Sequence, residues 1–149
     1  MSAIPFLKKH IFSKIEVQQI ANAIAAAEQK TSGEIRIYLE PKCADEPFNR
    51  ALQIFHELKM EQTAERNGVL IYLAYNDKKF AICGDEAIHE KCGQYFWDNV
   101  KEEMLKHFSQ KEILKGVLIA IEMAGEKLQA YFPYKDGDRN ELSDAPIIK

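Results

Sequence analysis

The fold of this chain is decided where it reads Thr31-Ser32-Gly33-Glu34-Ile35-Arg36-Ile37, at the junction between a helix and a strand. Before this junction, apolar residues recur at helical spacing behind Ser13-Lys14-Ile15-Glu16, a pattern typical of a capping box. After it, apolar and polar residues alternate from Glu34 to Glu40, which predicts a half-exposed strand. Gly33 is expected to stop the helix by taking the left-handed conformation, which glycine adopts without steric cost.

Two further strands are predicted in the middle of the chain. Residues 69–75 are apolar on both faces, which is typical of a central strand that is covered on both sides. Asn76-Asp77 tolerates positive φ and predicts a hairpin turn into a third strand over residues 78–83. A helix that begins at Phe48 and ends before Asn67-Gly68 separates the first strand from the second.

Three helices are expected in the second half of the chain. Asp85 is placed to cap a short helix that runs toward Gly93. A longer helix is expected over residues 94–108, where apolar side chains recur at helical spacing. Ser109-Gln110-Lys111-Glu112 has the pattern of another capping box and predicts the start of the last helix, which Pro133 ends.

The order of these elements predicts an α/β fold. The first two strands flank a helix and should be parallel, whereas the hairpin makes the third strand antiparallel. The result is a small mixed sheet of three or four strands with helices on both faces. We assign residues 1–133 to this one domain and residues 134–149 to a polar C-terminal tail.

Composition excludes several classes of protein. With 149 residues, 46% of them hydrophobic and 29% charged, the chain has the make-up of one globular domain. The net charge of −3, without a long basic run, argues against a nucleic-acid-binding protein. No apolar run approaches the roughly 20 residues that span a bilayer. Because the start of the chain also lacks the apolar stretch of a secretory signal, we expect a soluble, cytoplasmic protein with no transmembrane segment of its own.

The cysteines fit the same expectation. Cys43, Cys83 and Cys92 are three in number, so they cannot all pair, and no CxxC motif is present. Reduced thiols are the rule in cytosolic proteins. We therefore predict three free thiols.

Two kinds of cysteine site are weighed: a zinc site is disfavoured and a phosphatase loop is rejected. Cys83, His89 and Cys92 offer zinc ligands, but no fourth ligand is evident for a structural site. Cys43 and Arg50 resemble the ends of a cysteine phosphatase loop, but the gap is one residue too long for C-x₅-R, and Pro47 interrupts it.

One edge of the predicted sheet collects glycines and carboxylates. The strand directions bring Gly33-Glu34, Asn67-Gly68 and Gly84-Asp85-Glu86 to the same edge. Glu34, Asp85 and Glu86 supply hard oxygen ligands that suit Ca²⁺ or Mg²⁺. The alternative is that the glycines only make turns, Asp85 only caps its helix and Glu34 pairs with a lysine. The opposite edge, where open α/β sheets bind ligands, carries residues 40–46 and 75–78.

Three segments, 31–37, 67–74 and 80–85, together resemble the TPM domain family, and the similarity extends over residues 11–132. The resemblance implies a Rossmann-like αβα sandwich with a four-stranded sheet, and a fold with which calcium binding has been associated. It also implies varied roles: a plant member acts in photosystem II repair with acid phosphatase activity, and other members are membrane-associated. The chain departs from the family at Gly84-Asp85-Glu86-Ala87-Ile88, which stands where the family has Gly-Tyr-Gly-Leu-Glu.

Because the chain holds no complete catalytic motif, whether it is an enzyme stays open, and so do three functions. The first is a non-enzymatic interaction or accessory module for a membrane-associated partner. The alternative is a phosphatase of low activity, in which a divalent ion at Glu34, Asp85 and Glu86 polarises a phosphoryl oxygen. Arg66, Asn67 and Gly84 would then line the ligand site, with Arg66 offsetting the phosphate charge. The third function is a small-ligand or ion-binding domain.

Overall fold

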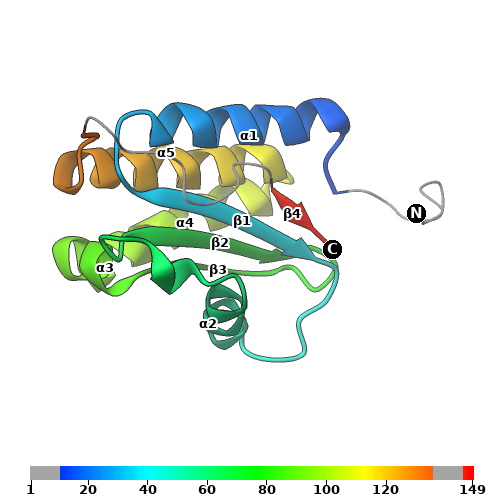
Figure 1. Cartoon of the computed structure of the whole chain (residues 1–149). Coiled ribbons are helices and arrows are strands. Elements are labelled where there is room, and N and C mark those ends of the chain that lie inside the picture. The colour runs from blue at the N-terminus through cyan, green and yellow to red at the C-terminus, as the bar shows by residue number, and fades with distance from the viewer. Residues whose placement is uncertain (1–10, 136–145) are drawn as a thin grey trace.

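The computed structural model describes residues 11–135 and 146–149. They form a four-stranded mixed sheet, in the order β3-β2-β1-β4, with helices on both faces (Figure 1). The elements are α1 (Lys14–Glu28), β1 (Glu34–Glu40), α2 (Pro47–Glu57), the short 3₁₀ helix η1 (Met60–Gln62), β2 (Gly68–Ala74), β3 (Lys79–Gly84), α3 (Glu86–Cys92), α4 (Gln94–Ser109), α5 (Ile113–Tyr131) and β4 (Ile147–Ile148). The predicted α/β class is confirmed.

The strand order follows the prediction. β1 and β2 run parallel over their whole length, from Glu34 opposite Gly68 to Glu40 opposite Ala74. β2 and β3 are antiparallel, and the apolar strand β2 lies inside the sheet between β1 and β3. Four strands agree with the predicted three or four, but the place of the fourth in the tail was not foreseen: in β4, Ile147 pairs in parallel with Tyr38 of β1. The predicted tail thus contributes a strand, while its residues 136–145 lie outside the described part of the chain.

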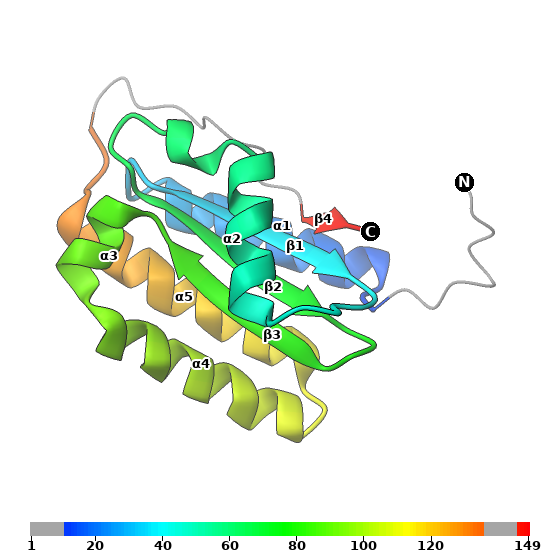
Figure 2. The same cartoon turned by 90° about the horizontal axis from the view of Figure 1, so that it is seen from below.

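The helices form one layer on each face of the sheet. Helices α1, α5 and α4 cover one face, and α2 covers the other (Figures 1 and 2). The alternating pattern of β1 predicted a half-exposed strand. The strand is instead buried, because its polar face lies in the α2 layer. Arg36 is 9% exposed and Tyr38 8% exposed on that face. The alternation therefore separates two buried environments rather than core and solvent.

The end of α1 corrects the predicted role of Gly33. The helix ends at Glu28, five residues before Gly33, and Gly33 does not have positive φ. The Thr31 hydroxyl instead donates to the carbonyls of Leu128 and Phe132, which joins this corner to the end of α5. A Cβ at Gly33 would lie 2.6 Å from the Leu128 Cδ2 atom, so glycine serves close packing here.

Two predicted turn motifs are also wrong in detail. Ser109 ends α4, where its hydroxyl donates to the Lys106 carbonyl at 2.9 Å, and it does not cap α5. In the hairpin between β2 and β3, the residue with positive φ is Lys78, at 55°. Asp77 is used differently, since its carboxylate accepts the Cys43 amide.

The two other predicted caps are present. Ser13 and Glu16 form the reciprocal capping box at the start of α1, and Asp85 caps α3. Within residues 11–135 and 146–149, no helix is long and apolar enough to cross a membrane. The three cysteines all lie in this part of the chain, and each is a free thiol.

Candidate functional site

The amino ends of β1 and β2 bring the predicted site residues to one edge of the sheet. Glu34 starts β1 opposite Gly68, and Gly84 ends β3 opposite Val69. Glu34 and Asn67 are each 1% exposed, and Asp85 is 6% exposed. Glu86 differs, because its side chain is 76% exposed. We call this group, with Arg66, the amino edge.

Arg66 pairs with two of the three acidic residues of the amino edge, Asp85 and Glu86. Its Nε and Nη2 atoms donate to the two carboxylate oxygens of Asp85 at 2.8 and 2.9 Å, a bidentate pair. Its Nη2 also lies 3.4 Å from Glu86 Oε2. The hydrogen bonds to Asp85 raise the pKa of Arg66. Two of the three predicted metal ligands, Asp85 and Glu86, are thus already paired with a positive charge of the chain itself.

Asp85 has a structural role in addition. Its Oδ1 atom accepts the Glu86 amide at 2.7 Å and so caps α3. The Ala87 amide donates to the Arg66 carbonyl at 3.1 Å, which fixes the first turn of α3 against the loop before β2. The capping alternative for Asp85 is thus confirmed, and a further role as metal ligand stays a prediction.

Asn67 has unused hydrogen-bonding capacity in its side chain at this edge. Its backbone amide donates to Thr63 Oγ1 at 3.3 Å, and its Nδ2 donates to Ser32 Oγ at 3.2 Å. Its Oδ1 atom is buried and has no hydrogen-bond partner among the described residues. An acceptor left in that state costs free energy, so this oxygen would favour a donor or a cation.

The predicted metal ligands do not form a closed cluster. Among the residues that the structure describes, no three Asp, Glu, His or Cys side chains are gathered as a metal ion would need. Gly84 also has another use, because a Cβ there would lie 2.4 Å from the Trp97 Cζ2 atom. Its missing side chain makes room for Trp97 rather than for a ligand.

Sequence reasoning missed a polar chain beside Asn67. Ser32 donates to Glu65 in a short hydrogen bond, and Lys135 Nζ lies 3.1 Å from the other oxygen of Glu65. Both hydrogen bonds lower the pKa of Glu65, and the one from Ser32 has the larger effect. Ser32 lies in the stretch that decides the fold, but no local pattern indicates its partner 33 residues away.

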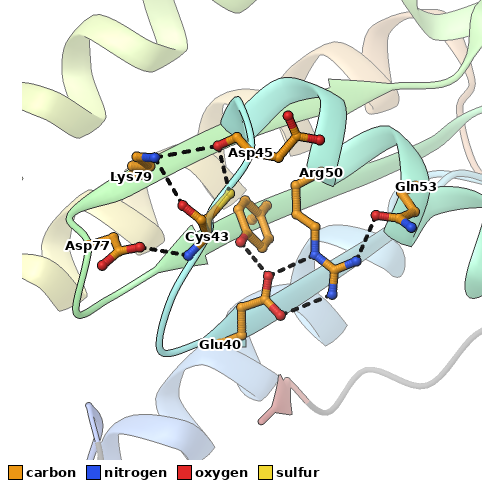
Figure 3. Close-up of polar contacts among 8 residues, drawn as sticks. Glu40, Cys43, Asp45, Arg50, Gln53, Asp77 and Lys79 are labelled. Carbon is orange, nitrogen blue, oxygen red and sulfur yellow. Dashed lines mark hydrogen bonds and ion pairs between the residues drawn. The ribbon is translucent and has the colours of Figure 1, made fainter.

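The opposite edge of the sheet, at the carboxyl ends of β1 and β2, holds a second ion pair (Figure 3). Arg50 donates to both carboxylate oxygens of Glu40, at 2.9 and 3.0 Å, and to Gln53 at 2.9 Å. Tyr72 also donates to Glu40. The pKa of Glu40 is lowered, mainly by its hydrogen bonds from Arg50. The pKa of Tyr72 is raised, mainly by burial. Arg50 thus binds Glu40.

Hydrogen bonds join the loop after β1 to the hairpin between β2 and β3 and to Lys79 of β3. The Cys43 amide donates to Asp77 at 2.8 Å, and Lys79 Nζ donates to the carbonyls of Cys43 and Asp45 at 2.9 and 3.4 Å (Figure 3). The Cys43 thiol is 3% exposed and faces the Asp45 carbonyl. The chain's own charges therefore fill this edge as well.

Two of the residues considered for zinc, Cys83 and His89, are poorly placed to bind it. Burial raises the pKa of the Cys83 thiol to about 12, and the charge of Asp85 adds to the effect. A thiol that is so hard to ionise is a poor metal ligand. His89 accepts a hydrogen bond from the Trp97 indole at 2.9 Å.

A groove runs between α1 and α5 on the outer side of the helical layer. Its volume is about 450 Å³. Small residues line its walls, namely Ala23, Ala26, Ala27 and Gly125, and Lys30, Glu122 and Glu126 are its charged residues. The two helices approach closely, since a Cβ at Gly125 would lie 3.0 Å from the Ala27 Cβ.

Comparison with known proteins places the chain among small relatives. The family model described as TPM domain matches residues 7–127. The NMR structure of the BA42 protein from the psychrophilic bacterium Bizionia argentinensis is similar over 100% of both chains, with 39% identity and a TM-score of 0.87. The solution structure of the N-terminal domain of cg2496 from Corynebacterium glutamicum covers 87% of this chain and 81% of its own, at 15% identity and a TM-score of 0.57, and shows the fold alone. A comparison with curated proteins finds no match.

Proposed function

The chain belongs to the TPM domain family, and we propose that it serves as a non-enzymatic interaction module for a membrane-associated protein partner. The observation that carries the proposal is the groove between α1 and α5. The charges at both sheet edges support it indirectly, because Arg66 pairs with Asp85 and Arg50 with Glu40. Charged groups that are paired with each other in this way have little hydrogen-bonding capacity left for a substrate.

The groove suits a helix of the partner. Its alanine side chains are small, which allows a second backbone to approach closely, and helix-in-groove binding is a common mode of peptide recognition. Glu122 and Glu126 are both exposed on α5, one helical turn apart. They favour a partner helix with an apolar face flanked by lysine or arginine.

A photo-crosslinking amino acid at Ala26 tests this function. Ala26 lines the groove and is exposed, so the substitution should be tolerated. In cells that normally make the protein, we expect an adduct with one membrane-associated protein. The adduct should be lost when Glu122→Lys and Glu126→Lys are combined with the crosslinker, because the charge of that wall is reversed.

The matched control places the same crosslinker at Glu102, which is exposed on α4, away from the groove. It should give no such adduct. Equal adducts from both positions, or none from Ala26, would contradict the proposal.

A second candidate function is a phosphatase of low activity that uses a divalent cation, and the unpartnered Oδ1 atom of Asn67 favours it. Asn67 Oδ1 and the carboxylates of Glu34 and Asp85 have the oxygen chemistry that Ca²⁺ and Mg²⁺ prefer. A bound ion would supply positive charge to a phosphoryl oxygen. Arg66 keeps a side chain that is 43% exposed, from which it can also meet a phosphate.

Thermal unfolding with added CaCl₂ or MgCl₂ tests this candidate, together with hydrolysis of p-nitrophenyl phosphate. An ion bound only by the folded state must raise the melting temperature. Asp85→Ala should abolish that rise, and Asp98→Ala, an exposed carboxylate on α4, should keep it. No rise in the parent protein, or the whole rise kept in Asp85→Ala, rules the candidate out.

A further inference from the structure

One side of β1 faces away from β2, and β4 covers only part of it. β4 pairs in parallel with Tyr38 and Leu39, whereas β2 pairs with all seven residues of β1. Figure 1 shows β4 beside the carboxyl-terminal part of β1. We propose that this part of β1 is a strand-accepting site for an extended segment of a partner protein, and that β4 occupies the site until such a segment displaces it.

The hydrogen bonds of β1 show which backbone groups form the site. The Tyr75 amide donates to the Glu40 carbonyl at 3.0 Å, so the even-numbered residues of β1 direct their backbone groups toward β2. Directions alternate along a strand, so Ile35 and Leu39 face the other side. The Ile35 amide donates to the Glu28 carboxylate at 2.7 Å, and this charged group guards the amino-terminal end of the edge against a further strand. The part beside Leu39 is the part that accepts one.

The contacts of β4 show what the site recognises. The first residue, Ile147, packs against the apolar cluster between α2 and the sheet. The second, Ile148, is 38% exposed, so its side chain matters less. The third, Lys149, donates its amide to the Leu39 carbonyl at 2.7 Å, and its carbonyl accepts the Tyr75 hydroxyl at 3.0 Å. The site therefore selects an extended segment with an aliphatic first residue and a third residue other than proline, which has no amide to donate.

β4 is held in a way that allows replacement. Each strand hydrogen bond contributes modestly to stability, so a pairing of two residues depends on β4 being part of the same chain and always near its site. A partner segment that makes the same contacts, and is bound to the protein at a second place, gains the same advantage. Addition of a strand to a sheet edge is a common mode of peptide recognition. This site is independent of the groove between α1 and α5.

The test uses the ¹⁵N-labelled full chain with Ile147→Asp, which removes the aliphatic contact of β4. The probe is the amidated peptide Ala-Pro-Ile-Ile-Lys, the sequence of residues 145–149. At millimolar peptide, we expect the Leu39 amide of the variant to shift saturably toward its position in the parent. In the parent, release of β4, followed at the Lys149 amide, should need about tenfold more peptide, because β4 competes at a high effective concentration. The control peptide Ala-Pro-Ile-Ile-Pro should bind about fivefold more weakly, since it lacks one donor.

A second variant protects the test against misfolding. Lys149→Pro removes one hydrogen bond at an exposed residue and should also bind the peptide more tightly than the parent does. The amides of β2 and β3 should keep their positions in both variants. No saturable shift at Leu39 in either variant, or equal affinity in parent and variants, would overturn the proposal. A Leu39 signal of the peptide-free parent that changes with protein concentration would overturn it too, because the occupant would then be β4 of a second copy.

Discussion

At the scale of single residues, two glycines of this chain lie where a neighbouring side chain packs directly against the backbone. Gly33 makes room for Leu128 and Gly84 for Trp97, and neither has positive φ. Gly93 is the contrasting case, because it has a φ of 78° and a Cβ added there would meet no atom within 4 Å. The sequence shows all three as glycines, but only the structure shows that packing requires two of them and backbone conformation the third.

Gly84→Ala should therefore destabilise the protein by overpacking. The new methyl group would meet Trp97 ring atoms at 2.4 and 2.8 Å, which costs about 1–3 kcal/mol when a core cannot relax. Urea unfolding measures the cost, and tryptophan emission should shift because the ring is displaced. Gly93→Ala is the control: it should cost about 1 kcal/mol through its left-handed backbone and leave the emission unchanged. Unchanged stability and emission in Gly84→Ala would refute the packing argument.

The Glu40–Arg50 pair predicts a pH dependence of stability. The pKa of Glu40 is lowered, chiefly by hydrogen bonds from Arg50, so the pair stabilises the fold above the unfolded pKa and loses this effect as the pH falls. Glu40→Gln should cost about 1–3 kcal/mol at neutral pH. Urea unfolding should show the difference from the parent shrinking below about pH 4, near the ordinary pKa of glutamate. A difference that is constant from neutral to acid pH would contradict this assignment.

At the scale of elements, the strands could be predicted more closely than the helix ends. β1 matches its predicted span, and β2 and β3 differ from theirs by one residue at each end, because hydrophobic runs bounded by turns are local signals. The corner after α1 depends on a partner far along the chain, because the Thr31 hydroxyl donates to the Leu128 carbonyl. β4 has two residues, too few for any periodic pattern to show.

The start of α3 gives a prediction that separates a cap from an ion pair. Asp85→Ala removes both, and it should lower the free energy of unfolding by about 1 kcal/mol or more. Asp85→Asn keeps a good capping residue and should recover most of that loss, because Arg66 is 43% exposed and solvent screens its charge. Hydrogen exchange at the Glu86 amide, with urea unfolding, measures both variants. Equal losses in the two would show that the ion pair, not the cap, stabilises α3.

At the scale of the whole molecule, the sheet order explains why the site could be foreseen only in part. Parallel β1 and β2 with antiparallel β3 were enough to place Glu34, Asn67 and Asp85 on one edge. The pairing of Arg66 with Asp85 could not be read from the sequence, because any nearby carboxylate is an equally good partner for an arginine. The hydrogen bond from Lys79 to the Cys43 carbonyl could not be read from the sequence either.

We propose that Arg66, by pairing with Asp85 and Glu86, leaves no cation site at the amino edge, and that the protein acts by binding a partner rather than by catalysis. The most direct test is a titration of ¹⁵N-labelled protein with Ca²⁺ to about 1 mM, following the Arg66 side-chain Nε–H and the amides of Glu34, Asn67 and Asp85. We predict that these signals stay in place and that p-nitrophenyl phosphate is not hydrolysed. Saturable shifts at these residues, accompanied by release of phosphate, would contradict the claim and establish the cation-dependent phosphatase instead.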